Sequence, residues 1–71
     1  MKSPNNALTL AATDVREAAA CVVAQIDMVS TFRRLGHKQA ELEARSMLRV
    51  ARANFVRAHA RLAEEQKSRA G

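Results

Sequence analysis

Residues 8–35, LTLAATDVREAAACVVAQIDMVSTFRRL, decide how this chain must fold. At 100° per residue the segment predicts a helix with two apolar stripes about a right angle apart. The first stripe consists of Leu8, Ala11, Ala12, Val15, Ala18, Ala19, Val22, Ile26 and Val29. The second stripe consists of Leu10, Cys21, Met28, Phe32 and Leu35. A helix with this profile needs covering on two sides.

The rest of the chain supplies one further helix. Gly36 follows the last apolar residue of the first helix, where a residue with positive φ commonly ends a helix. The second helix is expected over residues 37–67, with one apolar stripe formed by Ala40, Ala44, Met47, Leu48, Ala51, Phe55, Ala58 and Leu62. Because the connection is so short, the two helices must run antiparallel. We therefore expect an all-α fold, a single hairpin over residues 1–71 whose first helix spans about 5–35.

The second stripe of the first helix has no cover within one chain. A chain of 71 residues is near the lower limit for independent folding, and a lone hairpin buries less surface than a compact domain. The simplest cover is a second copy, which would give a four-helix bundle with two-fold symmetry. We expect a homodimer with an interface formed by Leu10, Cys21, Met28, Phe32 and Leu35. The alternative is that these are ordinary, scattered exposed apolar side chains.

Several classes of protein are disfavoured by composition. Cys21 is the only cysteine, which excludes an intramolecular disulfide and a cysteine-rich zinc site and favours a reducing, cytoplasmic setting. The charge-free runs are too short for a membrane-spanning helix. His37 and His59 are far apart, and no nucleophile has a base at helical spacing. We therefore expect no catalytic site, no metal site and no cofactor.

The formal net charge of +5 is the strongest bias of the composition, and it permits binding to nucleic acid, acidic protein or anionic lipid. One basic cluster lies at the expected hairpin tip, where Arg33, Arg34, His37 and Lys38 surround the apolar pair Phe32 and Leu35. Such a tip could dock into an acidic, partly apolar groove. It could equally be a solvated turn.

A second basic cluster follows one sector of the second helix. This sector carries Lys38, Arg45, Arg49, Arg52 and Lys67, with Leu42, Val50, Val56 and Ala60 among the arginines. The spacing predicts ion pairs between Glu41 and Arg45 and between Arg61 and Glu65. A surface that mixes arginine with aliphatic residues favours a protein partner over a phosphate backbone, although a solvated helix face is the simpler alternative. The candidate partner-binding residues are Phe32, Arg33, Arg34, Leu35, His37, Lys38, Arg45, Arg49 and Arg52.

Three functions fit these features. The first is a non-enzymatic protein-binding module, a small homodimeric inhibitor or adaptor that binds a larger protein. The second is a basic RNA- or DNA-binding hairpin dimer, similar in outline to the small hairpin that binds paired RNA loops in plasmid copy-number control. The third is a structural subunit or chaperone of a larger assembly.

In size, basic charge and alanine- and arginine-rich helical composition, the chain also resembles short phage-encoded proteins that bind and disable bacterial regulators. Quorum-sensing anti-activators are one such group. The resemblance covers the whole chain in general character, is carried by no motif, and so implies no particular functional residues. It implies a protein partner, which favours the first of the three functions.

Overall fold

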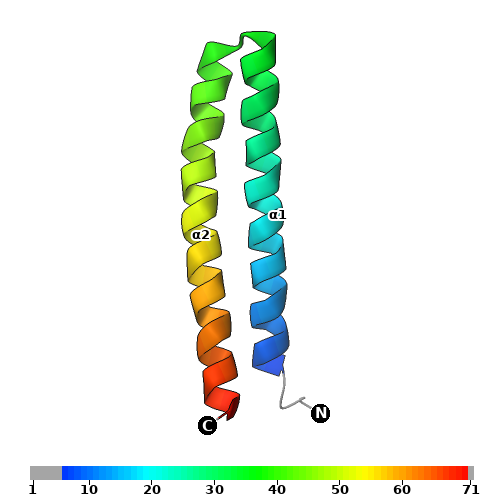
Figure 1. The fold of residues 1–71 in the computed structure, drawn as a ribbon, viewed down its shortest axis with the longest axis vertical. Coiled ribbons are helices and arrows are strands. Elements are labelled where there is room, and N and C mark those ends of the chain that lie inside the picture. The colour runs from blue at the N-terminus through cyan, green and yellow to red at the C-terminus, as the bar shows by residue number, and fades with distance from the viewer. Residues whose placement is uncertain (1–5, 71) are drawn as a thin grey trace.

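The computed structural model shows two long antiparallel helices joined by a tight turn (Figure 1). Helix α1 spans Asn6–Leu35 and helix α2 spans Lys38–Ala70. The structure describes the backbone of residues 6–70 and the side chains of residues 7–68, so the expected start of the first helix at residue 5 lies outside it. The expected all-α helical hairpin is confirmed. Helix α2 continues past the expected end at residue 67 because its last turns are rich in good helix formers.

The turn is fixed by local backbone bonds. Gly36 lies in the left-handed region with a φ of 75°, as its place in the sequence predicts. Its N–H donates to the Arg33 carbonyl over 3.2 Å, and the N–H of His37 donates to the Phe32 carbonyl over 2.9 Å. The rings of Phe32 and His37 stack with their centroids 6.3 Å apart. These bonds and the ring contact form a Schellman motif, which ends α1 and turns the chain back on itself.

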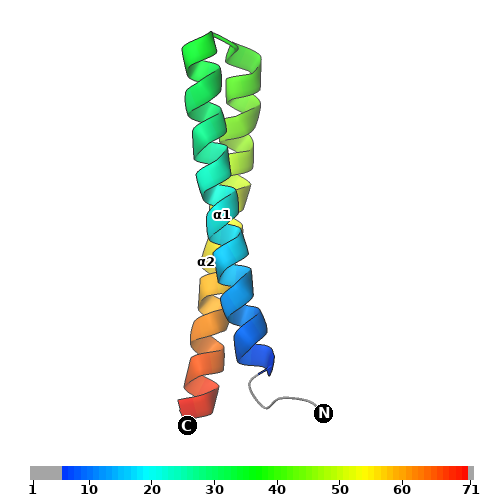
Figure 2. The ribbon, with the colours of Figure 1, turned by 90° about the vertical axis from the view of Figure 1, so that its right-hand side faces the viewer.

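The two helices meet along a line that we call the seam, in which residues recur at alternating steps of three and four. Helix α1 contributes Leu8, Ala11, Val15, Ala18, Val22, Gln25, Val29 and Phe32, all buried or half-buried. Helix α2 contributes Glu41, Ala44, Leu48, Ala51, Phe55, Ala58, Leu62 and Glu65, also buried or half-buried. This is the seven-residue repeat of a coiled coil. The side view shows the helices crossing each other at a shallow angle, as such a repeat requires (Figure 2).

Alanines set how closely the helices approach. Ala44, Ala51 and Ala58 recur every seven residues on α2 and are 3%, 7% and 7% exposed. They alternate along the seam with larger side chains such as Leu48 and Phe55, which are half-buried. Small side chains at one position of the repeat let two helix backbones come close, while the larger ones fill the space beside them.

Four side chains lie where the predicted stripes did not place them. Ile26 and Met47 were expected in the helix–helix contact but are 44% and 55% exposed, and Gln25 is half-buried in the seam instead. Phe32 was expected on the second stripe and also lies in the seam. The reason is periodicity: a straight helix of 3.6 residues per turn drifts by about 20° per heptad from the 3.5-residue repeat that the seam follows.

The seam makes a thin core. Within the described residues, Val29 is the largest buried hydrophobic side chain, and the other buried ones are all alanine. The molecule measures 51 × 21 × 12 Å, a single layer of two helices. Its accessible surface of 5377 Å² exceeds the roughly 4,400 Å² that a compact monomer of its mass exposes. Large hydrophobic side chains that remain exposed are Leu10, Val23, Ile26, Met28, Leu35, Leu42, Met47, Val50 and Val56.

The close approach at the alanines predicts the effect of enlarging one of them. Ala51→Leu should lower the free energy of unfolding by about 1–3 kcal/mol, because the added atoms force the helices apart. Ala53→Leu is the matched control, since Ala53 is exposed on the outer side of the same helix. Urea unfolding followed by circular dichroism measures the free energy of unfolding of both variants. Equal stability of the two variants would contradict the proposed close contact at Ala51.

Candidate interaction surfaces

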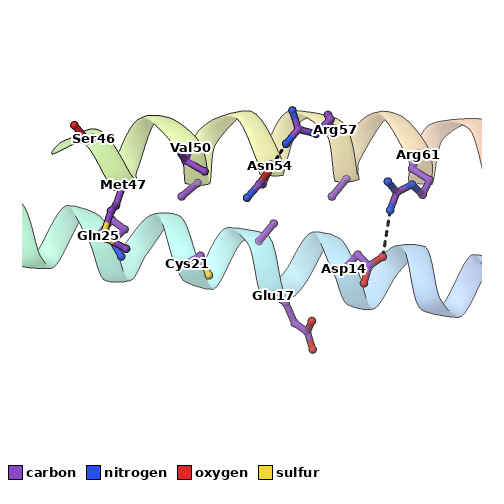
Figure 3. Close-up of a pocket in the computed structure, with 13 residues that line it drawn as sticks. Asp14, Glu17, Cys21, Gln25, Ser46, Met47, Val50, Asn54, Arg57 and Arg61 are labelled. Carbon is purple, nitrogen blue, oxygen red and sulfur yellow. Dashed lines mark hydrogen bonds and ion pairs between the residues drawn. The ribbon is translucent and has the colours of Figure 1, made fainter. Parts of the chain in front are cut away.

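A groove runs along one side of the hairpin between α1 and α2 (Figure 3). Its floor consists of the seam residues Ala18, Gln25, Ala51 and Ala58. Its walls include Cys21 on α1 and Met47, Val50 and Asn54 on α2, all of them exposed. The groove encloses a volume of about 630 Å³. It exists because the alanines of the seam leave space that the neighbouring side chains do not fill.

The groove is charged toward the open end of the hairpin. Asp14 Oδ2 on α1 lies 3.5 Å from Arg61 Nη1 on α2, so this ion pair bridges the groove (Figure 3). Glu17 and Arg57 lie on the two rims one turn further along, and in Figure 3 the side chain of Glu17 points away from α2. The expected pairing of Arg61 with Glu65 is wrong, because Arg61 reaches across to α1 instead of along its own helix.

Toward the hairpin tip the same side of the molecule carries exposed apolar side chains. Cys21, Met28 and Leu35 recur every seven residues and so line one side of α1, and the last two are 41% and 59% exposed. On α2, Met47 and Val50 are 55% and 60% exposed beside the groove. The second apolar stripe of α1 therefore has an apolar counterpart on α2. Sequence reasoning missed this counterpart because it assigned Met47 to the helix–helix contact.

The residues of the expected dimer interface are thus distributed over two environments. Leu10, Cys21, Met28 and Leu35 are exposed. Phe32 is half-buried in the seam, where it also supports the turn through His37.

One polar atom in the floor of the groove lacks a partner. Gln25 Oε1 is buried and accepts no hydrogen bond from the described residues. A buried acceptor without a donor is unfavourable by about 1–3 kcal/mol, so the site favours a molecule that can supply one.

Near the hairpin tip, Glu41 is held by two arginines. Glu41 is 8% exposed, and its Oε2 accepts hydrogen bonds from Arg45 Nη2 over 2.8 Å and from Arg45 Nε over 3.1 Å. Arg33 Nε on the other helix lies 3.4 Å from the same oxygen. The predicted pair of Glu41 and Arg45 is confirmed, whereas sequence reasoning missed Arg33, whose contact depends on the hairpin. The hydrogen bond from Arg45 lowers the pKa of Glu41 most, burial raises it, and Arg33 lowers it further.

A basic face lies on the side of α2 away from the groove. We define it by Lys38, Arg45, Arg49 and Arg52 together with Leu42 and Val56. All six are exposed, Leu42 by 52% and Val56 by 65%. Leu42, Arg49 and Val56 recur every seven residues and therefore share one line, so apolar and cationic side chains alternate on it.

The candidate partner-binding residues at the hairpin tip divide by role. Arg33 and Arg45 share Glu41, and Phe32 and His37 stack on each other, so these four have structural contacts. Arg34, Leu35 and Lys38 are exposed.

The described part of the chain holds no group of three histidine, cysteine or acidic side chains placed to bind a metal ion. Within the same residues, neither helix has a stretch apolar and long enough to cross a bilayer. No protein-family model matches the sequence, and neither a curated protein nor a solved structure shows a significant match to it.

The contacts of Glu41 predict a pH dependence of stability. Because the pKa of Glu41 is lowered in the folded chain, its stabilising contribution is present above the unfolded pKa and is lost as the pH falls through the lower, folded pKa. Glu41→Gln should therefore be less stable than the wild type at pH 7, and the difference should vanish in acid. Chemical unfolding at a series of pH values measures the difference in free energy of unfolding between the variant and the wild type.

Glu43→Gln is the control for this experiment, because Glu43 is exposed two residues further along the same helix. It should track the wild type at every pH. A stability difference between wild type and Glu41→Gln that persists unchanged in acid would contradict the role given to the Glu41 carboxylate.

Proposed function

We propose that this chain is a non-enzymatic protein-binding module that works as a homodimer. Two hairpins would pack through their grooves into a four-helix bundle, and the basic face of each would bind a larger protein, as an inhibitor or adaptor. The observation that carries the proposal is the separation of two surfaces: on one side of α2 a groove with exposed apolar side chains in its wall, and on the other a mixed cationic and aliphatic face.

The thin core supports self-association. A hairpin whose largest buried hydrophobic side chain is Val29 has little apolar burial to offset the entropy of ordering two long helices. The excess of roughly 1,000 Å² in exposed surface over a compact chain of this mass is of the order that each partner loses in a stable interface. Packing groove against groove would cover Met28, Met47 and Val50, which otherwise face water.

The basic face supports a protein partner with an acidic, partly apolar surface. Arginine beside exposed aliphatic side chains is typical of protein–protein interfaces, where both kinds of contact are used. A surface built to follow phosphates has no need for Leu42 and Val56 between its cations. With two Phe and neither Trp nor Tyr, the chain also has few rings on which bases could stack.

The resemblance to phage-encoded inhibitors points to a bacterial regulatory protein as the class of partner. The single cysteine, Cys21, is exposed and free, which suits a reducing cytoplasmic compartment.

Dimerisation through the groove predicts different effects for two similarly exposed side chains. Met47→Asp should convert the dimer to monomer, because it buries a carboxylate in the interface. Val56→Asp is the matched control: Val56 is 65% exposed and Met47 55%, but Val56 lies on the basic face. Light scattering coupled to size-exclusion chromatography gives the mass of each. A wild-type chain that is monomeric at high concentration would contradict the dimer.

Partner binding through the basic face predicts loss of the partner on charge reversal. A protein captured from bacterial lysate by the wild type should be lost from the Arg49→Glu/Arg52→Glu variant and retained by Arg16→Glu, since Arg16 is exposed on the other helix. Affinity for a DNA or RNA duplex should be weak at physiological salt. Tight duplex binding with a steep salt dependence would instead favour the nucleic-acid-binding alternative.

A further inference from the structure

We infer that the two hairpins of the dimer lie side by side with their tips at the same end, groove against groove, related by a two-fold axis along the length of the bundle. The inference rests on the proposed homodimer and adds its orientation. It follows from the order in which charged, polar and apolar residues succeed one another along the two walls of the groove.

The ion pair between Asp14 and Arg61 fixes which residues of the two helices are level. Because the helices are antiparallel, a step of seven residues forward on α1 is matched by a step of seven back on α2. Cys21 is therefore level with Asn54, and Met28 with Met47. From the open end to the tip, the α1 wall carries acidic residues and then Cys21, whereas the α2 wall carries basic residues, then the polar Asn54, and then Val50 and Met47.

With the tips at the same end, α1 of one copy lies over α2 of the other at the same level. Each acidic segment, Asp14 and Glu17, then faces the basic segment of the other copy, Arg61 and Arg57. Met28 faces Met47 of the other copy at the apolar end. The groove is thus self-complementary in charge and in hydrophobicity at once.

With the tips at opposite ends, α1 of one copy lies over α1 of the other copy, and α2 lies over α2. Each helix then runs antiparallel to its equivalent, and the two are related by a rotation about the middle of the hairpin. Asp14 would then face Met28, and Arg61 would face Met47. The ion pair within each hairpin would then be desolvated against apolar side chains, and the other copy would contribute no opposite charge to it. The sequence of side chains along the groove therefore disfavours the opposed arrangement.

The unpaired acceptor of Gln25 points to the same orientation. Gln25 lies in the groove floor, and its Oε1 is buried without a donor. With the tips together, the two copies of Gln25 lie at one level on either side of the axis, where each amide can donate to the other. In the opposed arrangement the two would be about 12 Å apart along the bundle. A buried amide pair is a known device for fixing register and orientation between helices.

This orientation places both basic hairpin tips at one end of the bundle. The exposed tip residues Arg34, Leu35 and Lys38 of the two copies would form one bivalent end. The two basic faces would lie on opposite flanks and run in the same direction, an arrangement suited to a partner with two equivalent acidic sites.

Charge reversal across the groove tests the pairing of the rims. Glu17→Arg and Arg57→Glu should each weaken the homodimer roughly five- to twenty-fold, because like charges then face each other twice. An equimolar mixture of the two variants should recover wild-type affinity as a heterodimer, because every pair is again opposite in sign. Analytical ultracentrifugation measures the dimer dissociation constants of the two variants and of their mixture. Failure of the mixture to associate more tightly than either variant would overturn the proposed orientation.

Distances between spin labels test the orientation directly. Gln39→Cys lies near the tip and Lys67→Cys near the open end, both at exposed outward positions of α2, and each is labelled in a Cys21→Ala chain. With the tips together, double electron–electron resonance should give about 30 Å for both labels. In the opposed arrangement the two copies of each label are about 45 Å apart or more. In an opposed dimer that overlaps only near the tips, the two labels at position 67 are about 60 Å apart.

A short distance at both sites is the expected result. A long distance at either site overturns the orientation but leaves the homodimer standing. Monomeric mass together with the absence of any dipolar signal would overturn the homodimer itself.

Discussion

The close packing of α1 on α2 along the alanines of the seam is the contact on which the rest of the structure depends. It brings the backbones together, but alanine side chains bury little apolar area, so the core stays thin. The same small side chains form the floor of the groove, and larger side chains such as Met47 and Val50 remain exposed along its wall. A close helix contact and an uncovered groove are therefore two consequences of one sequence pattern.

The hairpin tip determines the register of that contact. The Schellman motif at Gly36 fixes where α1 ends, and the carboxylate of Glu41 joins Arg33 of α1 to Arg45 of α2. At the far end, Asp14 and Arg61 form a second link between the helices. Because register sets which residues are level, these contacts also set the order of charge along the groove, on which the proposed orientation of two copies depends.

Much of this fold follows from the sequence, and the exceptions have physical causes. Gly36 marked the turn because only a residue tolerant of positive φ suits that position. Sequence reasoning missed Gln25 because the predicted stripes collect apolar side chains alone, although Gln25 lies seven residues after Ala18. The contacts of Arg33 with Glu41 and of Arg61 with Asp14 could not be found from local spacing, because each joins the two helices. The seven-residue repeat of Ala44, Ala51 and Ala58 places Met47 beside the seam, where it is exposed.

The central claim is that one hairpin leaves apolar surface that a second copy covers. Its most direct test is the thermal unfolding midpoint, followed by circular dichroism, over a hundred-fold range of chain concentration. Unfolding of a dimer to two chains is driven by mass action, so the midpoint should rise steadily with concentration. A cooperative transition whose midpoint stays constant over that range would show that the hairpin folds alone, and it would contradict the account.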